Sequence, residues 1–149
     1  MKLRVYLDTS VFSAYYDDRL TDRQRETEAF WTRLGEFEAA TSELAQEELA
    51  QTPDAVQRVK LQNLLAGFVI YPVTEEMREL AHSYIDTGVF TPVMFNDALH
   101  VAAAVLTRQD ILVSWNFKHL VNRRRRAKVN DFNISLGLPT IEIVAPPEI

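Results

Sequence analysis

The feature that most constrains the fold of this chain is the alternation of short apolar runs with longer segments of helical periodicity. Runs typical of strands fall near residues 3–7, 38–41, 67–73, 111–115 and 140–144. Strands that alternate with helices predict βαβ units and a mostly parallel sheet. We therefore expect an α/β fold, and because no repeat or linker interrupts the pattern, we expect a single domain over residues 1–149.

The helices are predicted by apolar residues at helical spacing and by capping residues at their starts. The clearest one follows Thr74 and ends at Gly88. Others are expected after Thr21, over about 43–51, between Pro53 and Leu64, after Asn96 or Asp97, and from Asn122 to Leu136.

The 149 residues include no cysteine. This excludes a disulfide framework, a thiolate zinc site and a cysteine nucleophile. The first strand begins without a preceding signal peptide, and no apolar run reaches the roughly 20 residues of a membrane helix. We therefore expect a cytoplasmic protein with no membrane contact.

Charge is unevenly distributed along the chain. The formal net charge is −5, yet one segment carries basic residues and no acid: Lys118, Arg123, Arg124, Arg125, Arg126 and Lys128. An acidic body with one basic patch suggests a metal site together with a polyanion contact. A solubilising surface helix is the alternative interpretation of the same run.

Two polar residues follow predicted strands. Asp8 ends the run Leu3 to Leu7, and Asn116 follows the run that begins at Ile111. Ligands of open parallel sheets bind outside the carboxyl ends of the strands, so both residues fall where chemistry is expected. Taken alone, Asp8 is as well explained as a helix cap and Asn116 as a turn residue.

Two further acids belong to predicted helices. Glu48 falls within the apolar stripe of its helix, at i+4 from Leu44 and i+3 from Ala45. A carboxylate that faces inward needs a partner, which could be a metal or a buried arginine. Asp97 begins the helix whose inner face starts at Ala98, and it too could be only a cap.

Together, the four positions predict a metal site. Two strand ends and two flanking helices of a parallel sheet would bring Asp8, Glu48, Asp97 and Asn116 to one edge. Crowded carboxylates repel and raise one another's pKa values, which a hard divalent cation relieves. Oxygen ligands without cysteine favour Mg²⁺ or Mn²⁺ over zinc, and such an ion can bind phosphate oxygens.

The sequence resembles the PIN-domain nucleases, and in particular the VapC-type toxins of bacterial type II toxin–antitoxin pairs. The resemblance extends over essentially the whole chain. Four motifs carry it in order: Val5–Ser10, Ser42–Leu49, Asn96–Ala104 and Leu112–Leu120. The first acid of the family maps to Asp8, its glutamate to Glu48 and its third acid to Asp97; the fourth position, commonly Asp, is Asn116 here.

This resemblance implies a three-layer fold with a parallel sheet, a metal-dependent endoribonuclease, a homodimer and a cognate antitoxin. Asp8, Glu48 and Asp97 would hold Mg²⁺ or Mn²⁺, with Asn116 as a neutral member of the site. The basic run from Lys118 to Lys128 would contact RNA phosphate or an acidic antitoxin segment.

Several neighbouring residues have two possible roles. The hydroxyls of Thr9, Ser10 and Ser114 could hold the ligating carboxylates, although the first two could equally be caps. His100 and His119 could act as acids or bases, but structural hydrogen bonds explain them at least as well. Trp115 and Phe117 could stack nucleobases, whereas core packing is the simpler expectation for both.

Two other functions fit parts of the pattern. One is a catalytically weakened RNA-binding or antitoxin-binding module, which Asn116 and the basic run would suit. The other is a phosphatase with an aspartyl nucleophile at the end of the first strand, of the kind found in haloacid-dehalogenase-like enzymes. That chemistry calls for a second Asp two residues after Asp8, where this chain has Ser10.

Overall fold

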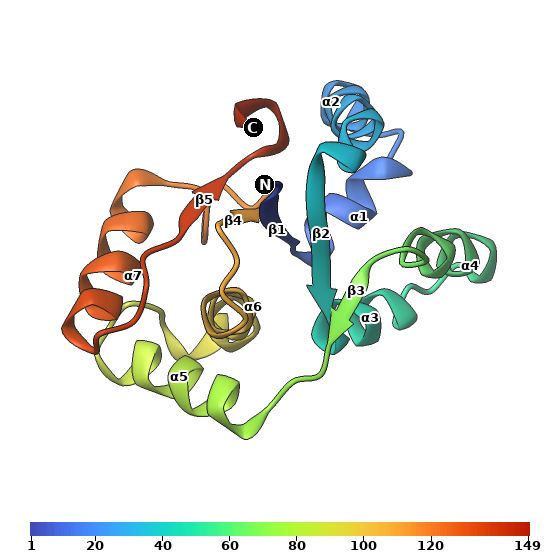
Figure 1. Cartoon of the computed structure of the whole chain (residues 1–149). Helices are drawn as coiled ribbons and strands as arrows, with labels where there is room; N and C mark the ends of the chain where they lie inside the picture. The colour runs from blue at the N-terminus through green and yellow to red at the C-terminus, as the bar shows by residue number, and fades with distance from the viewer.

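The computed structural model of the chain describes residues 1–149 and is built on a five-stranded sheet in the order β3-β2-β1-β4-β5 (Figure 1). Every neighbouring pair of strands is parallel. The strands are β1 (Leu3–Leu7), β2 (Phe37–Ser42), β3 (Val69–Tyr71), β4 (Ile111–Val113) and β5 (Glu142–Val144). The predicted α/β fold with a parallel sheet is therefore confirmed.

Seven α-helices and three short 3-10 helices accompany the strands, and all but the last 3-10 helix lie between strands in the chain. The α-helices are α1 (Thr9–Tyr15), α2 (Thr21–Thr32), α3 (Glu43–Ala50), α4 (Ala55–Leu64), α5 (Glu75–Asp86), α6 (Phe95–Leu106) and α7 (Arg123–Ser135). The 3-10 helices are η1 (Leu34–Glu36), η2 (Pro92–Met94) and η3 (Pro146–Glu148).

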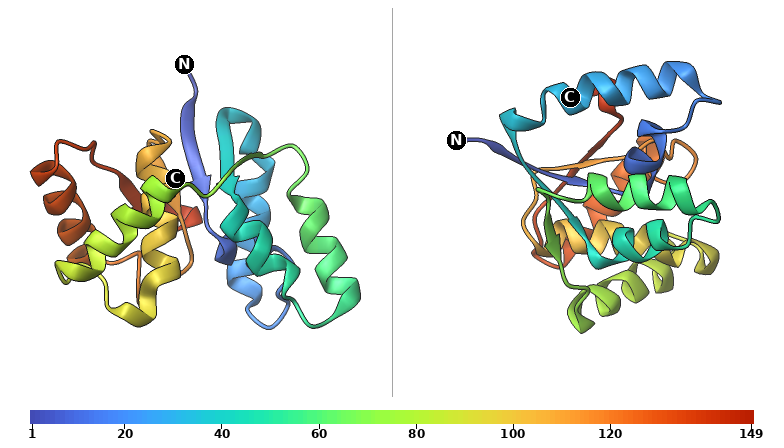
Figure 2. Two further views of the ribbon diagram at one scale, coloured as in Figure 1. Left: turned by 90° about the horizontal axis from the view of Figure 1, so that it is seen from below. Right: turned by 90° about the vertical axis from the view of Figure 1, so that its right-hand side faces the viewer.

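The strand order explains how the helices form two outer layers. The chain moves outward from β1 to β3, then crosses back to β4 and moves outward to β5 on the other side. Because parallel crossovers are right-handed, these two directions place their helices on opposite faces of the sheet. Figure 2 shows α2, α3 and α4 on one side of the sheet and α5, α6 and α7 on the other.

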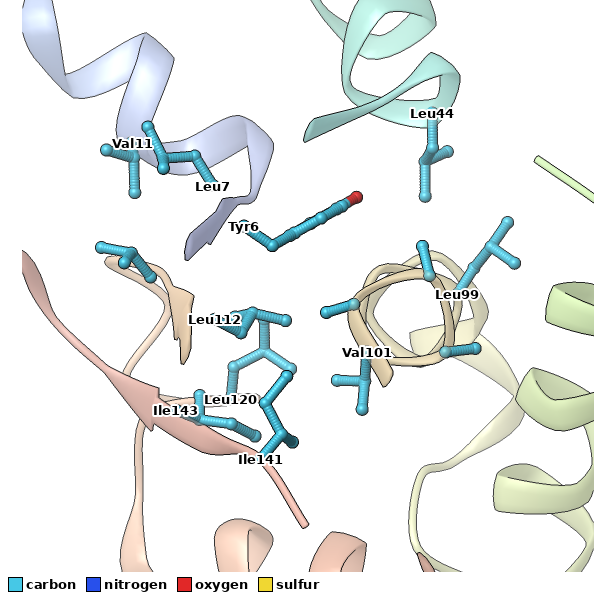
Figure 3. Close-up of a cluster of buried hydrophobic side chains, with 14 of the residues drawn as sticks. Tyr6, Leu7, Val11, Leu44, Leu99, Val101, Leu112, Leu120, Ile141 and Ile143 are labelled. Atoms are coloured by element: carbon cyan, nitrogen blue, oxygen red, sulfur yellow. The ribbon is translucent and has the colours of Figure 1, made fainter. Parts of the chain in front are cut away.

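Burial on both faces suits the central strands. Val5, Tyr6 and Leu7 are consecutive in β1 and all fully buried, as expected of a strand with helices on both sides. Helix α6 is also buried nearly all round, from Ala98 to Val105, because it lies between the sheet and α5. Figure 3 shows side chains from β1, β4, β5 and α6 meeting in this core.

Most of the predicted helix boundaries agree with the structure. Thr74 caps α5 by accepting a hydrogen bond from the backbone N–H of Met77, and Asn122 caps α7. The predicted cap at Thr21 is wrong, since α2 begins at that residue with no side-chain cap. Helix α6 begins at Phe95, before both residues predicted to open it.

The carboxyl ends of the strands lie at one edge of the sheet, and this edge positions the candidate site. The register pairs Leu7 of β1 with Val113 of β4, so both strands end at the same level. Asp8 continues the ladder by donating its backbone N–H to the Val113 carbonyl at 3.2 Å. None of the helices combines the length and the apolar character that a membrane span requires.

Candidate active site

Asp8 lies in a pocket of hydroxyl groups at the end of β1. Its backbone is extended and its side chain caps α1, accepting from the backbone N–H of Ser10 at 3.1 Å. The Ser10 hydroxyl donates to the same carboxylate oxygen at 2.6 Å, and the Ser114 hydroxyl donates to the other oxygen at 2.6 Å. We call Asp8, Ser10 and Ser114 the Asp8 cluster. Asp8 therefore caps α1 and also lies at the sheet edge where the site is predicted, so the two interpretations of this residue are compatible.

Burial raises the pKa of the Asp8 carboxyl above its ordinary value. The charge of His100 and the hydrogen bonds from Ser10 and Ser114 act in the opposite direction, and the negative charge of Asp97 adds to the increase. Asp8 has only 4% of its surface exposed and is hydrogen-bonded to neutral hydroxyls. A cation placed beside it would therefore stabilise the ionised form.

Glu48 is held by a second group of side chains. The Thr9 hydroxyl and the His100 Nε2 both donate to Glu48 Oε1 at 2.7 Å. The other ring nitrogen of His100 lies 2.7 Å from the phenol oxygen of Tyr6, which in turn lies 2.7 Å from the hydroxyl of Ser42. We call these five residues the Glu48 cluster. Figure 3 shows the Tyr6 oxygen pointing from β1 toward the space between α3 and α6.

The Glu48 cluster lowers the pKa of its carboxylate. Burial acts to raise the pKa of Glu48, but the hydrogen bond and charge of His100, together with the Thr9 hydroxyl, outweigh it. The inward position predicted from the apolar stripe of α3 is thus occupied by a half-buried carboxylate whose partner is a histidine rather than an arginine. Tyr6 has a raised pKa, mainly because it is fully buried, so it is a neutral phenol.

Asp97 forms a third group with Asn116 and His119, which we call the Asp97 cluster. It lies in the first turn of α6, and the Nδ1 of His119 donates to it at 2.9 Å. The amide nitrogen of Asn116 faces the other oxygen of Asp97 at 3.4 Å. The amide oxygen of Asn116 accepts the backbone N–H of His119 at 2.9 Å, which fixes the orientation of the amide.

Asn116 therefore orients Asp97 and closes a turn. Its oxygen, which we expected to reach a metal, is engaged by the backbone, while its donor nitrogen faces the acid. The Asn116 backbone N–H also donates to the Ser114 hydroxyl at 2.9 Å, which connects the Asp97 cluster to the Asp8 cluster. The contacts favour a positioning role for Asn116 over that of a ligand.

The three acids are arranged around the same sheet edge, each with its own hydrogen-bond partners. The Asn116 N–H bond to Ser114 joins the Asp97 cluster to the Asp8 cluster, and Thr9, the residue after Asp8, bonds to Glu48, so the three clusters are neighbours. No three His, Asp or Glu side chains converge closely enough to form a finished set of metal ligands. The donors are nevertheless those that suit Mg²⁺ or Mn²⁺, since all three are carboxylates and no thiolate is present. The chemistry of Asp8, Glu48 and Asp97 therefore fits such an ion.

The basic run divides into exposed and anchored residues. Arg123 and Arg124 are exposed, as are Lys118 and Lys128. Arg125 instead donates to the Val89 carbonyl and lies 4.7 Å from the centre of the Phe90 ring, and Arg126 donates to the Ile143 carbonyl. Arg125 and Arg126 therefore fasten α7 to the body of the protein, so we do not retain them in the proposed RNA surface.

The structure also identifies residues that the sequence alone does not single out. Tyr6 is conspicuous in the sequence only as a strand former, yet its hydroxyl is the partner of His100. A tyrosine predicted inside a parallel sheet needs a hydrogen-bond partner, and that requirement is the available signal. Trp115 is buried as expected, but Phe117 is 44% exposed, so the expectation of core packing is wrong for Phe117.

Comparison with known proteins assigns the fold. A family signature described as the PIN domain matches residues 5–118. No curated protein is significantly similar in sequence to the chain.

Among solved structures, FitAcB from Neisseria gonorrhoeae aligns with a TM-score of 0.62 and 14% identity over 97% of this chain and 99% of that chain. VapBC2 from Rickettsia felis, bound to a promoter DNA fragment, aligns with a TM-score of 0.60 and 15% identity, and the alignment covers 96% of this chain and 98% of that chain. DNA-bound VapBC from Salmonella typhimurium aligns with a TM-score of 0.58 and 13% sequence identity, and the alignment covers 97% of this chain and 98% of that chain. At such identities the likeness shows a shared fold, whereas the family signature covers more than half of the chain, and on that basis the chain belongs to the PIN-domain family.

Proposed function

We propose that this protein is a metal-dependent endoribonuclease that hydrolyses RNA phosphodiester bonds, and that it is the toxin of a bacterial type II toxin–antitoxin pair. The observation that carries the proposal is the arrangement of three carboxylates around one sheet edge of a PIN-domain fold. Each has its own donors, namely the hydroxyls at Asp8, His100 with Thr9 at Glu48, and His119 with Asn116 at Asp97.

Asp8, Glu48 and Asp97 would hold Mg²⁺ or Mn²⁺. A bound divalent ion supplies Lewis acidity that polarises a phosphodiester and favours deprotonation of an attacking water. The protein's own contribution is orientation, because the hydroxyls of Thr9, Ser10 and Ser114 restrict the carboxylates to one geometry. No residue of the site is placed as a covalent nucleophile, so direct hydrolysis is the reaction we propose.

The exposed cations Lys118, Arg123, Arg124 and Lys128 are proposed to contact RNA phosphates. They belong to one segment that follows Asn116, and in this proposal a bound strand contacts both the acids and this basic surface. Replacing Arg123 and Arg124 by Gln should weaken binding of a single-stranded RNA, and the slope of log K against log salt should fall by about 0.7 for each lost phosphate contact. Equal binding and an equal slope in this variant would show that the two arginines are only solvated.

The proposed partners are a cognate antitoxin and a second copy of this chain. The support is the shared fold with proteins solved as VapBC complexes, over nearly the whole of both chains. The test is to look for a small protein encoded by the neighbouring gene, to copurify it with this protein, and to measure whether RNA cleavage is lost in the complex.

A catalytically weakened binding module is the second candidate. It is favoured by Asn116, because this neutral residue stands where the family commonly has an acid and donates to Asp97. An RNA that is bound but never cleaved in Mg²⁺ or Mn²⁺ would support this candidate.

The deciding experiment is cleavage of single-stranded RNA with Mg²⁺, with Mn²⁺ and with excess EDTA. We expect cleavage with either metal and none in EDTA. Glu48→Gln should abolish cleavage, whereas Glu47→Gln, its exposed neighbour on α3, should cleave normally. Cleavage that persists in EDTA, or that is equal in both variants, would contradict the proposal.

A further inference from the structure

A cavity of about 520 Å³ opens beside the candidate site, between α1, the first turn of α2 and the segment 115–118. This volume is in the range of roughly 300–1,000 Å³ that small-molecule sites occupy. The lining of the cavity includes Ser10, Arg23, Trp115, Asn116, Phe117 and Lys118. Ser10 bonds to Asp8 and Asn116 faces Asp97, so the cavity begins at side chains that contact two of the three acids.

One wall of this cavity is aromatic and firmly held. The indole N–H of Trp115 donates to the Thr27 hydroxyl at 2.9 Å, and that hydroxyl donates to the Arg23 carbonyl one helical turn earlier. Phe117 packs edge-on against Trp115 with ring centres 6.0 Å apart. The guanidinium of Arg23 lies 5.4 Å from the centre of each ring. A planar cation and two aromatic rings are thus held together by contacts within the protein.

Phe117 is the unusual member of this wall. It is 44% exposed although it follows a buried strand and a buried tryptophan. Folding therefore leaves an aromatic surface exposed to water in the wall of a cavity, next to residues that hold the candidate acids. Nucleobases stack on such rings whatever their sequence, because every base has a π-face.

The charges of the cavity favour an anionic ligand. Arg23 and Lys118 are both part of its lining, while the one acid there, Asp17, is paired with Arg19 at 2.9 Å. An unstacked nucleotide of a polyanionic strand offers both a flat base for the wall and a phosphate for the cations.

We propose that this cavity binds one unstacked nucleobase of the RNA, stacked on Phe117 and Arg23, with Lys118 near the adjoining phosphate. The proposal rests on the proposed function for the identity of the strand and adds to it a base-binding subsite next to the bond that is cleaved. Trp115 is a supporting residue that keeps the wall rigid.

The test is binding of a single-stranded RNA octamer that contains 2-aminopurine, measured by fluorescence in EDTA so that the strand stays intact. Phe117→Ala should weaken binding roughly 5- to 100-fold, the effect of one lost base stack, and should reduce quenching of the probe. Phe117→Trp should restore both. Arg23→Gln should also weaken binding, whereas Arg25→Gln, an exposed arginine on the same helix outside the cavity, should leave binding unchanged.

Thermal unfolding of each variant separates a lost contact from a lost fold. Wild-type affinity and quenching in a folded Phe117→Ala protein would overturn the subsite, even if the protein cleaves RNA as proposed. The reverse result, Phe117-dependent binding with no cleavage in Mg²⁺ or Mn²⁺, would support the subsite and contradict the proposed nuclease. Unchanged RNA binding with weakened antitoxin binding would assign the cavity to the partner protein and overturn the proposal.

Discussion

The Asp8 cluster and the Glu48 cluster hold the same functional group in opposite ways. Asp8 is nearly fully buried and bonded to neutral hydroxyls, and burial raises its pKa. Glu48 is only partly buried and bonded to His100, and its pKa is lowered. The protein thus bonds one acid directly to an ionisable histidine and the other only to neutral donors.

This difference indicates which of the two carboxylates would be stabilised more by a bound metal ion. An ionised Asp8 lacks a directly bonded cation in the protein, so a bound metal would contribute most at that position. Glu48 is already oriented by hydrogen bonds from His100 and Thr9. We infer that Asp8 couples metal binding to stability, whereas Glu48 mainly provides a ligand held in a fixed position.

The largest effect is expected from Asp97, which belongs to neither of these two clusters but adjoins Asp8. Asp97→Asn should reduce RNA cleavage about 1,000-fold or more, because a metal supplies several kcal/mol and 1.4 kcal/mol is a factor of ten. The measurement is single-turnover cleavage in Mn²⁺, with exposed Asp131→Asn as the control. Comparable rates in the two variants would remove Asp97 from the site.

A smaller effect is expected from the donors of the Glu48 cluster. Thr9→Val keeps the shape of the side chain but removes the hydroxyl that donates to Glu48 at 2.7 Å. Mn²⁺ affinity measured by calorimetry should fall by about 10- to 100-fold, as for other residues that orient metal ligands. Thr32→Val, which changes an exposed hydroxyl of α2, should bind Mn²⁺ like the wild type. Equal affinities for all three proteins would contradict the positioning role of Thr9.

Asn116→Asp tests the neutral residue of the Asp97 cluster. The change places a carboxylate oxygen where the amide nitrogen now faces Asp97 at 3.4 Å. Repulsion between the two carboxylates should lower the melting temperature in EDTA, by about 2–4 °C for each kcal/mol lost from the free energy of unfolding. The added negative charge should tighten Mn²⁺ binding. Differential scanning fluorimetry and calorimetry report the two quantities. If both are unaltered, Asn116 lies outside the influence of the site.

The smallest effect is expected on thermal stability, when the charge of Glu48 is removed. A lowered pKa means that the carboxylate stabilises the folded state above its unfolded pKa, and that this contribution is lost as pH falls through the folded pKa. Glu48→Gln should therefore melt roughly 1–2 °C below wild type at neutral pH in EDTA, and this difference in melting temperature should disappear below about pH 4. Glu47→Gln should have the same melting temperature as wild type at both pH values. A Glu48→Gln protein more stable than wild type would reverse the assigned sign.

The sheet can be predicted from the sequence because its strands and helices have different periods. The run that ends at Leu7 and the one that begins at Ile111 are each followed by a polar residue. Because parallel strands end at one edge of their sheet, this pattern is enough to bring Asp8 and Asn116 to the same edge. The caps at Thr74 and Asn122 follow from equally local chemistry.

The site is less predictable, because its contacts join residues far apart in the chain. Tyr6 and His100 are 94 positions apart, and no local pattern indicates that their side chains meet. The basic run illustrates the same limit, since only tertiary packing shows that Arg125 and Arg126 are structural while the two arginines before them are exposed. The orientation of the Asn116 amide also depends on a backbone turn that composition does not reveal.

The comparison between the two clusters is tested most directly by the melting temperatures of wild type and Asp8→Asn, each in EDTA and in Mn²⁺. The amide of Asn can keep the hydrogen bond from Ser10 and donate to the Ser114 hydroxyl, so the fold should be retained. Because the pKa of Asp8 is raised, its ionised form costs stability, and this cost grows as pH rises from the unfolded pKa to the folded pKa.

At neutral pH we therefore expect Asp8→Asn to melt above wild type in EDTA, by about 2–4 °C for each kcal/mol of relieved burial cost. In Mn²⁺ the order should reverse, because only the wild type gains stability from the bound ion. The same order of melting temperatures in both solutions would contradict the account.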